Sequence, residues 1–248
     1  MESKEEEIVM RELSLFSGAG GGLLATKHLL GWETIGYVEI NDYCQRVIAQ
    51  RIKDGYLDNA PIFTDIRAFI DSGCCEFYKG ITDIVTGGFP CQDISCAGSG
   101  KGLNGERSGL WQEMSQIICR VKPKYVLVEN SPMLTIRGLG TILRDLAQMG
   151  FDAKWGCLSA SQIGASHNRE RMWIVANSKK VYGISCNPEK RINIQKLRGL
   201  HTKQKIKSRL SGRYDGVGDW MDRLKAIGNG QVPAVVEVAW KVLSGDQL

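Results

Sequence analysis

The chain has 248 residues, of which 43% are hydrophobic and 24% charged, a balance typical of a folded globular protein. No apolar run is long enough to cross a bilayer, and the acidic start at residues 1–7 has no apolar stretch of a signal peptide. A cytoplasmic protein without a membrane partner is therefore expected. The eight cysteines form no CxxC pair and only three histidines are present, so neither a disulfide framework nor a metal site is predicted.

Charge is unevenly distributed along the chain. Between Lys179 and Lys225, thirteen Lys or Arg stand against four Asp or Glu, a net charge of +9, which leaves −4 for the rest of a chain with a total of +5. A basic segment on a mildly acidic body favours a polyanionic partner, although a solvated basic loop would have the same composition.

Short apolar runs alternate with amphipathic stretches from residue 11 to about 176. Strands are predicted at residues 13–16, 34–39, 81–86, 125–129 and 172–176, with one more ending near Asp65. Helices are predicted at residues 23–30, 43–52, 110–121, 136–149 and 232–243. This alternation predicts an α/β fold with a doubly wound, mostly parallel sheet, whose ligands bind at the carboxyl ends of the strands.

A glycine-rich segment, residues 16–22, lies between the first predicted strand and helix. Its glycines allow a tight turn and a close approach of the backbone to a ligand. The segment also satisfies the dinucleotide fingerprint, and Glu39, at the end of the next strand, could bind ribose hydroxyls in a dinucleotide or in S-adenosylmethionine. Asp65 could accept a hydrogen bond from an adenine amino group. The alternative is a sharp turn without a ligand.

Cys91 has the local sequence of a nucleophile. It follows a predicted strand, Pro90 fixes the chain before it, and Gly87 and Gly88 leave room around it. Most of the other cysteines are interpreted as small buried hydrophobic residues. The polar, glycine-rich stretch at residues 98–105 is typical of a mobile lid and lacks the P-loop pattern.

Two further segments carry charged groups beside predicted strands. Glu129 ends a strand, where its carboxyl group could hold an amino group and a ring nitrogen of a base, or form a salt bridge or a helix cap. Arg169 and Arg171 alternate before the last strand, so their side chains point to one side and suit phosphate or carbonyl oxygens.

Together these segments resemble the DNA (cytosine-5) methyltransferases. The resemblance rests on five motifs in this order: Phe16-x-Gly18-x-Gly20, Pro90-Cys91-Gln92, Glu129-Asn130, Arg169-x-Arg171 and Gly228-Asn229. It covers nearly the whole chain apart from the acidic start and the basic segment. It implies the class I S-adenosylmethionine-dependent methyltransferase fold, S-adenosylmethionine as cofactor in place of a dinucleotide, and double-stranded DNA as substrate.

The resemblance implies cofactor-binding roles for Phe16, Gly18, Ala19, Gly20, Gly21, Glu39, Ile40, Asp65, Ile66, Pro90 and Asn229. Phe16 would stack on the adenine, Glu39 would hold the ribose, and Asp65 with Ile66 would bind the adenine edge. Ile40 occupies a place that is often aromatic in the family, so one wall of the pocket is expected to be looser.

The resemblance also implies catalytic roles. Cys91 would be the nucleophile, Glu129 the acid that holds the base, and Arg171, next to Arg169, a contact to the flipped cytosine and its phosphate. To donate to ring N3, Glu129 must be protonated, so burial should raise its pKa. The target base must leave the stacked duplex to react. His167 stands where the family usually has glutamine, which leaves its role open.

Three regions follow from the resemblance: a catalytic and cofactor-binding domain at 9–176, a short basic target-recognition segment at 177–222, and a C-terminal segment at 223–248 that returns to the first domain. A segment this short is expected to bind mainly through phosphates and to read only about two to four base pairs. A restriction nuclease and a separate recognition subunit are the other candidate partners.

Three alternatives remain at this point. An RNA (tRNA) cytosine-5 methyltransferase on the same scaffold would share the Pro-Cys and Glu-Asn motifs. A non-catalytic DNA-binding paralogue would need no intact set of Cys91, Glu129 and Arg171. A dehydrogenase would explain the glycine segment but not Pro90-Cys91-Gln92.

Overall fold

A computed structural model describes residues 9–90, 110–178, 222, 225–226 and 228–245, and all structural statements below concern these residues. Cys91, the predicted lid at 98–105 and nearly all of the basic segment at 177–222 lie outside the described residues.

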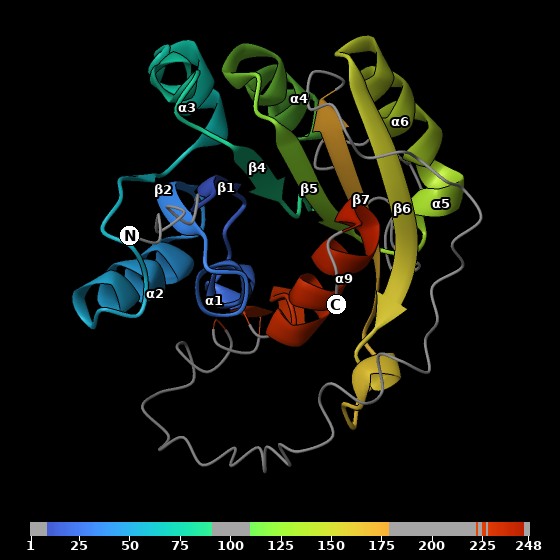
Figure 1. Cartoon of the computed structure of the whole chain (residues 1–248). Coiled ribbons are helices and arrows are strands. Elements are labelled where there is room, and N and C mark those ends of the chain that lie inside the picture. The colour runs from blue at the N-terminus through green and yellow to red at the C-terminus, as the bar shows by residue number, and fades with distance from the viewer. Residues whose placement is uncertain (1–8, 91–109, 179–221, 223–224, 227, 246–248) are drawn as a thin grey trace, which may run out of the picture.

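A seven-stranded sheet forms the centre of the molecule, with the strand order β3-β2-β1-β4-β5-β7-β6 (Figure 1). The strands are β1 (Arg11–Leu15), β2 (Glu33–Val38), β3 (Ile62–Phe63), β4 (Ile84–Gly87), β5 (Tyr125–Asn130), β6 (Phe151–Ser159) and β7 (Glu170–Ser178). The pairs among β1 to β5 are parallel, whereas β7 runs antiparallel to both β5 and β6. The predicted mostly parallel, doubly wound sheet is therefore present.

Helices cover both faces of the sheet. The α-helices are α1 (Gly21–His28), α2 (Asp42–Lys53), α3 (Ile66–Asp71), α4 (Leu110–Val121), α5 (Leu134–Arg137), α6 (Leu139–Gln148) and α9 (Pro233–Ser244). Two 3-10 helices, η1 (Cys74–Tyr78) and η3 (Ser161–Ile163), join them. Helices α3, α4 and α6 lie on one face of the sheet, and α1 and α9 lie on the other (Figure 1). Buried side chains of each group belong to a separate hydrophobic cluster.

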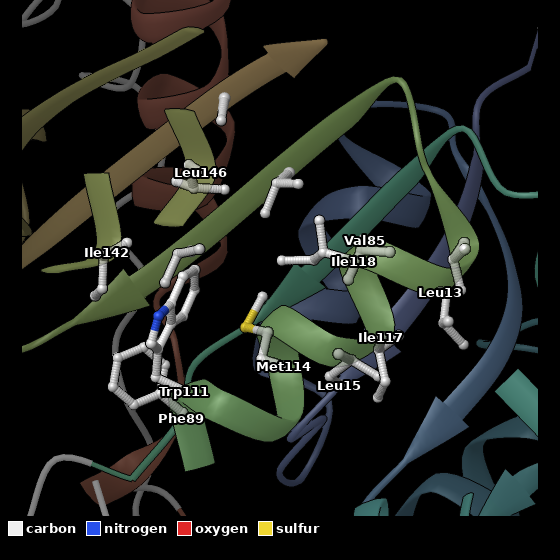
Figure 2. Close-up of a cluster of buried hydrophobic side chains, with 14 of the residues drawn as sticks. Leu13, Leu15, Val85, Phe89, Trp111, Met114, Ile117, Ile118, Ile142 and Leu146 are labelled. Carbon is white, nitrogen blue, oxygen red and sulfur yellow. The ribbon is translucent and has the colours of Figure 1, made fainter. Parts of the chain in front are cut away.

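The periodicity of the sequence explains this layering. In β5, Val126 and Val128 belong to the core under α4, whereas Leu127 between them belongs to the core under α9, as the two-residue period of a strand requires. In α4, Trp111 and Met114 lie on one buried stripe that meets β1 and β4 (Figure 2). Packing on both faces therefore fixes the sheet, and with it the positions of the carboxyl ends of its strands.

The structure corrects two details of the predicted elements. The helix predicted at 136–149 is two helices, α5 and α6, because the chain changes direction at Gly138. The nine-residue strand β6 was not predicted, and it places β7 between two neighbours instead of at the end of the series. Strand β6 lies at the edge of the sheet and only its ends are buried, so its sequence has no clear alternation.

Candidate active site

A pocket lies at the carboxyl ends of β1, β4 and β5. Its walls come from the turn after β1, the first turn of α1, residues 87–88 after β4, Glu129 near the end of β5, and residues 229–231 before α9. This edge of a doubly wound sheet is where ligands bind. The predicted site residues Phe16, Gly18, Gly21, Glu129 and Asn229 all line this pocket.

The glycine-rich segment makes the turn from β1 into α1. Gly20 has a φ of 89° and is the N-cap of α1, a left-handed conformation that glycine adopts without strain. A Cβ atom at Gly21 would lie 2.5 Å from the backbone oxygen of Gln231, and one at Gly22 would lie 2.3 Å from its side-chain Oε1. These two glycines therefore leave room for the C-terminal segment, and the predicted close approach of the backbone to a ligand stays a prediction.

The carboxylate of Glu39 is buried beside this turn. Its Oε2 accepts from the backbone N–H of Gly18 at 2.6 Å, and its Oε1 accepts from that of Asn41 at 2.8 Å. Glu39 therefore fixes the shape of the turn after β1. A role toward the ribose stays a prediction, in which the remaining lone pairs of the carboxylate would accept from the hydroxyls.

We expect Glu39→Ala to weaken S-adenosylmethionine binding about tenfold or more, because it removes two hydrogen bonds to a charged group that shape the turn. Turnover at saturating cofactor should fall much less. Calorimetric titration measures the affinity, with Glu33→Ala, at the exposed start of the strand that leads to Glu39, as the matched control. An unchanged affinity in Glu39→Ala would remove Glu39 from the cofactor site.

The other predicted cofactor positions lie farther out. Asp65 is the N-cap of α3, where its Oδ1 accepts from the N–H groups of Arg67 and Ala68 at 2.7 and 3.3 Å. The side chain of Ile66 is buried in the core, whereas Ile40 is 72% exposed. In the described part of the chain, the predicted cofactor residues that are not part of the pocket lining are Ala19, Gly20, Glu39, Ile40, Asp65, Ile66 and Pro90. The adenine contact of Asp65 and Ile66, and the cofactor-binding roles of the others, stay predictions.

Glu129 is the buried acid of the pocket. Its Oε1 lies 2.9 Å from Nε of Arg171, and a Cβ atom at Gly88 would lie 2.8 Å from its Oε2, so a side chain at position 88 would displace the carboxyl group. Burial raises the pKa of Glu129 above its ordinary value, against the opposing charges of Arg171 and Arg169 and a hydrogen bond from Gln231. A raised pKa is what the mechanism predicted from the sequence requires, because Glu129 must be protonated to donate to N3 of the base.

The two arginines of the Arg-x-Arg motif have different partners. Arg171 forms the ion pair with Glu129, and its Nη1 donates to the backbone oxygen of Glu170 at 2.7 Å. Arg169 instead donates from Nη1 to the backbone oxygen of Gly228 at 2.6 Å. Arg169 thus ties the start of β7 to the C-terminal segment, and a catalytic role for it stays a prediction. His167 is exposed.

The chain that leads to Cys91 is held by Asn130. Its Nδ2 donates to the backbone oxygen of Phe89 at 3.2 Å, and its Oδ1 accepts from the N–H of Ser131 at 2.8 Å. Phe89 is buried against Trp111, with ring centroids 5.9 Å apart, and Pro90 is exposed. Asn130, named in the sequence only as part of a motif, therefore fixes the backbone at Phe89, just before the Pro-Cys motif.

A sequence model of the family described as C-5 cytosine-specific DNA methylase matches residues 10–234. This chain belongs to that family. The predicted resemblance is confirmed, and with it S-adenosylmethionine as the methyl donor, so the dinucleotide alternative is wrong.

In the part of the chain that the structure describes, no helix is long and apolar enough to span a membrane.

Several methyltransferases are similar to this family member over about two thirds of its length. The Type II methyltransferase M.CviJI of Paramecium bursaria Chlorella virus IL3A is 35% identical over 68% of this chain and 43% of its own. M.FnuDI of Fusobacterium nucleatum is 32% identical over 68% of this chain and 47% of its own. This chain thus spans less than half the length of either relative.

Solved structures share the fold. DNMT2 of Spodoptera frugiperda, as an E260A/E261A/K263A mutant, matches with a TM-score of 0.57 at 19% identity, over 71% of this chain and 52% of its own. The methyltransferase EhMeth of Entamoeba histolytica matches with a TM-score of 0.52 at 16% identity, over 69% of this chain and 53% of its own. The predicted class I methyltransferase fold is confirmed.

Proposed function

We propose that this chain is a DNA (cytosine-5) methyltransferase that acts in the cytoplasm on a cytosine flipped out of double-stranded DNA, with Cys91 as its covalent nucleophile. The observation that carries the proposal is Glu129, a buried acid with a raised pKa, placed beside the glycine turn in the pocket where the cofactor of this family would bind.

The pocket suits S-adenosylmethionine. A Cβ atom at Gly18 would meet nothing within 4 Å, so the backbone of the turn is open to a ligand there. Phe16, Gly18 and Asn229 line the pocket, and Glu39 stabilises the turn by accepting a hydrogen bond from the backbone N–H of Gly18. When bound, S-adenosylmethionine supplies an electrophilic methyl group to C5 of the base.

Glu129 prepares the base for attack. In its protonated form it donates to ring N3 and accepts from the exocyclic amino group, which draws electrons toward N3. Arg171, paired with Oε1 of Glu129 in the structure, orients the carboxyl group and places a positive charge beside the base. A pKa raised by burial keeps Glu129 protonated to higher pH than an ordinary carboxyl group.

Cys91 makes and breaks the covalent bond. Its thiolate forms a bond to C6, and the electron pair of the C5–C6 double bond becomes available to take up the methyl group at C5. Loss of the C5 proton to a base then restores the double bond, and the C6–sulfur bond breaks to release the thiolate. Asn130 supports these steps by fixing the chain two residues before the cysteine, at Phe89.

Recognition of the target is proposed for the basic segment at 177–222, which would bind DNA mainly through its phosphates. Each phosphate contact steepens the dependence of the affinity on salt by roughly 0.9 log units. The M.CviJI and M.FnuDI relatives carry the name Type II methyltransferase, which supports DNA as the substrate and a restriction nuclease as a candidate partner.

The test is covalent trapping on duplex DNA that contains 5-fluorocytosine, because fluorine at C5 cannot leave as the proton does. Wild type and Cys119→Ser, a change at an exposed cysteine of α4, should give a stable adduct, whereas Cys91→Ser should give none. An adduct in Cys91→Ser would place the nucleophile elsewhere. Trapping only on 5-fluorocytosine tRNA would favour the RNA enzyme, and trapping only with an added subunit would overturn the single-chain enzyme.

A further inference from the structure

Gln231 lies where three parts of the site meet. It stands between the Gly228-Asn229 motif and α9, and it lines the pocket. Its backbone packs against the first turn of α1, since a Cβ atom at Gly21 would lie 2.5 Å from its oxygen and 3.1 Å from its nitrogen. Only a residue without a side chain at position 21 allows this approach.

The side-chain amide of Gln231 spans from the glycine turn to Glu129. Its Oε1 lies at Gly22, 2.3 Å from where a Cβ atom would be. Its Nε2 lies 3.3 Å from the Cβ position of Gly88, and Oε2 of Glu129 lies 2.8 Å from that same point. The side chain hydrogen-bonds Glu129, and because a carboxylate only accepts, the amide nitrogen is the donor.

The carboxyl group of Glu129 is thus approached from two sides. Arg171 holds Oε1 from β7, and Gln231 reaches the group from the segment before α9. We propose that Gln231 is a positioning residue, which ties the cofactor turn to Glu129 and fixes the orientation in which the acid meets the base. The inference rests on the proposed function, since it takes Glu129 as the acid that holds the cytosine.

Two consequences follow for the reaction. Without the Gln231 amide, the carboxyl group of Glu129 is held by Arg171 alone and can rotate away from the orientation that the base requires. A misplacement of a catalytic group by about 1 Å can lower the rate around a hundredfold. A donor to the carboxylate also favours the charged form, so its loss raises the pKa of Glu129 further. Because the reaction needs protonated Glu129, the fall in rate at high pH should then move to higher pH.

The experiment is a double-mutant cycle on turnover under saturating cofactor and DNA. Gln231→Leu should lower the rate about 10- to 100-fold in the wild-type background but less than about threefold in Glu129→Gln, because it acts through that acid. In the pH–rate profile of Gln231→Leu, the fall in turnover at alkaline pH should occur at a higher pH than in wild type. Gln50→Leu, at an exposed position of α2, is the matched control and should change neither.

Equal losses in the two backgrounds, or an unmoved alkaline limb, would overturn the positioning role and leave Gln231 a packing residue. Gln231→Met, which nearly keeps the size of the side chain and removes the N–H donor without adding a charge, provides the same comparison if Gln231→Leu does not fold. A Glu129→Gln enzyme with full turnover would instead contradict the proposed function, so the two failures are distinguishable.

Discussion

Glu129→Gln should lower turnover by about a hundred- to a thousandfold, and it should leave the affinity for S-adenosylmethionine nearly unchanged. The amide can still donate and accept hydrogen bonds, but it cannot give a proton to N3, and general acid catalysis contributes about 10²- to 10⁴-fold. In the structure Glu129 contacts Arg171, Gly88 and Gln231 at the inner end of the pocket. Single-turnover methylation and calorimetric titration measure the two effects separately.

The pH dependence gives a second check on the same change. The pKa of Glu129 is raised, so the wild-type rate should fall as the pH rises through that value and the acid loses its proton. Glu129→Gln should lack this limb, whereas Glu33→Gln, at an exposed position, should keep it. Equal losses of turnover and cofactor affinity in Glu129→Gln would contradict the assignment of this residue to the base.

The fold was predictable where burial is regular. Strand β5 is a short continuous apolar run that is buried along nearly its whole length, and α4 has a single buried stripe at helical spacing, so each gives a clear signal in the sequence. Strand β6 was missed because only Phe151, Leu158 and Ser159 of its nine residues are buried. An edge strand takes its conformation from pairing with its neighbour β7, which no local pattern records.

The site was predictable where one residue type carries the chemistry. The burial of Glu129 and the direction of its pKa shift follow from a carboxyl group at the end of a buried strand. The contacts of Gln231 with Gly21 and Gly22 join residues about 210 positions apart, and the contact of Arg169 with Gly228 is also long-range. Such contacts depend on how α9 packs against α1, which the sequence pattern does not specify.

A second buried acid was missed for the same reason. Glu12 of β1 is 1% exposed and accepts hydrogen bonds from three threonine hydroxyls, those of Thr26 and Thr86 at 2.6 Å and that of Thr34 at 3.1 Å. The threonines come from α1, β4 and β2, so one carboxyl group joins four elements at the wall of the pocket, which Glu12, Thr26 and Thr86 line. Burial raises the pKa of Glu12, and the three hydroxyls oppose that rise.

Glu12→Leu should lower the free energy of unfolding by about 2–4 kcal/mol, because buried hydroxyls that lose their acceptor cost about 1–3 kcal/mol each. Thr26 keeps a second acceptor, the backbone oxygen of Leu23 at 3.3 Å, so most of the loss should come from Thr34 and Thr86. Urea denaturation measures the effect, with Glu33→Leu as the exposed neighbour for comparison.

The cause can be separated from a simple packing defect by adding Thr86→Val. This change should cost less in the Glu12→Leu background than in wild type, since it removes a hydroxyl that has already lost its acceptor. Glu12→Gln should retain most of the free energy of unfolding, and its stability relative to wild type should increase as the pH rises. The raised pKa of Glu12 gives wild type a contribution that is full below the ordinary pKa of about 4.3 and is lost as the pH rises through the folded-state value. Additive losses in the cycle, together with identical pH profiles for Glu12→Gln and wild type, would show that the carboxyl group does not hold these four elements together.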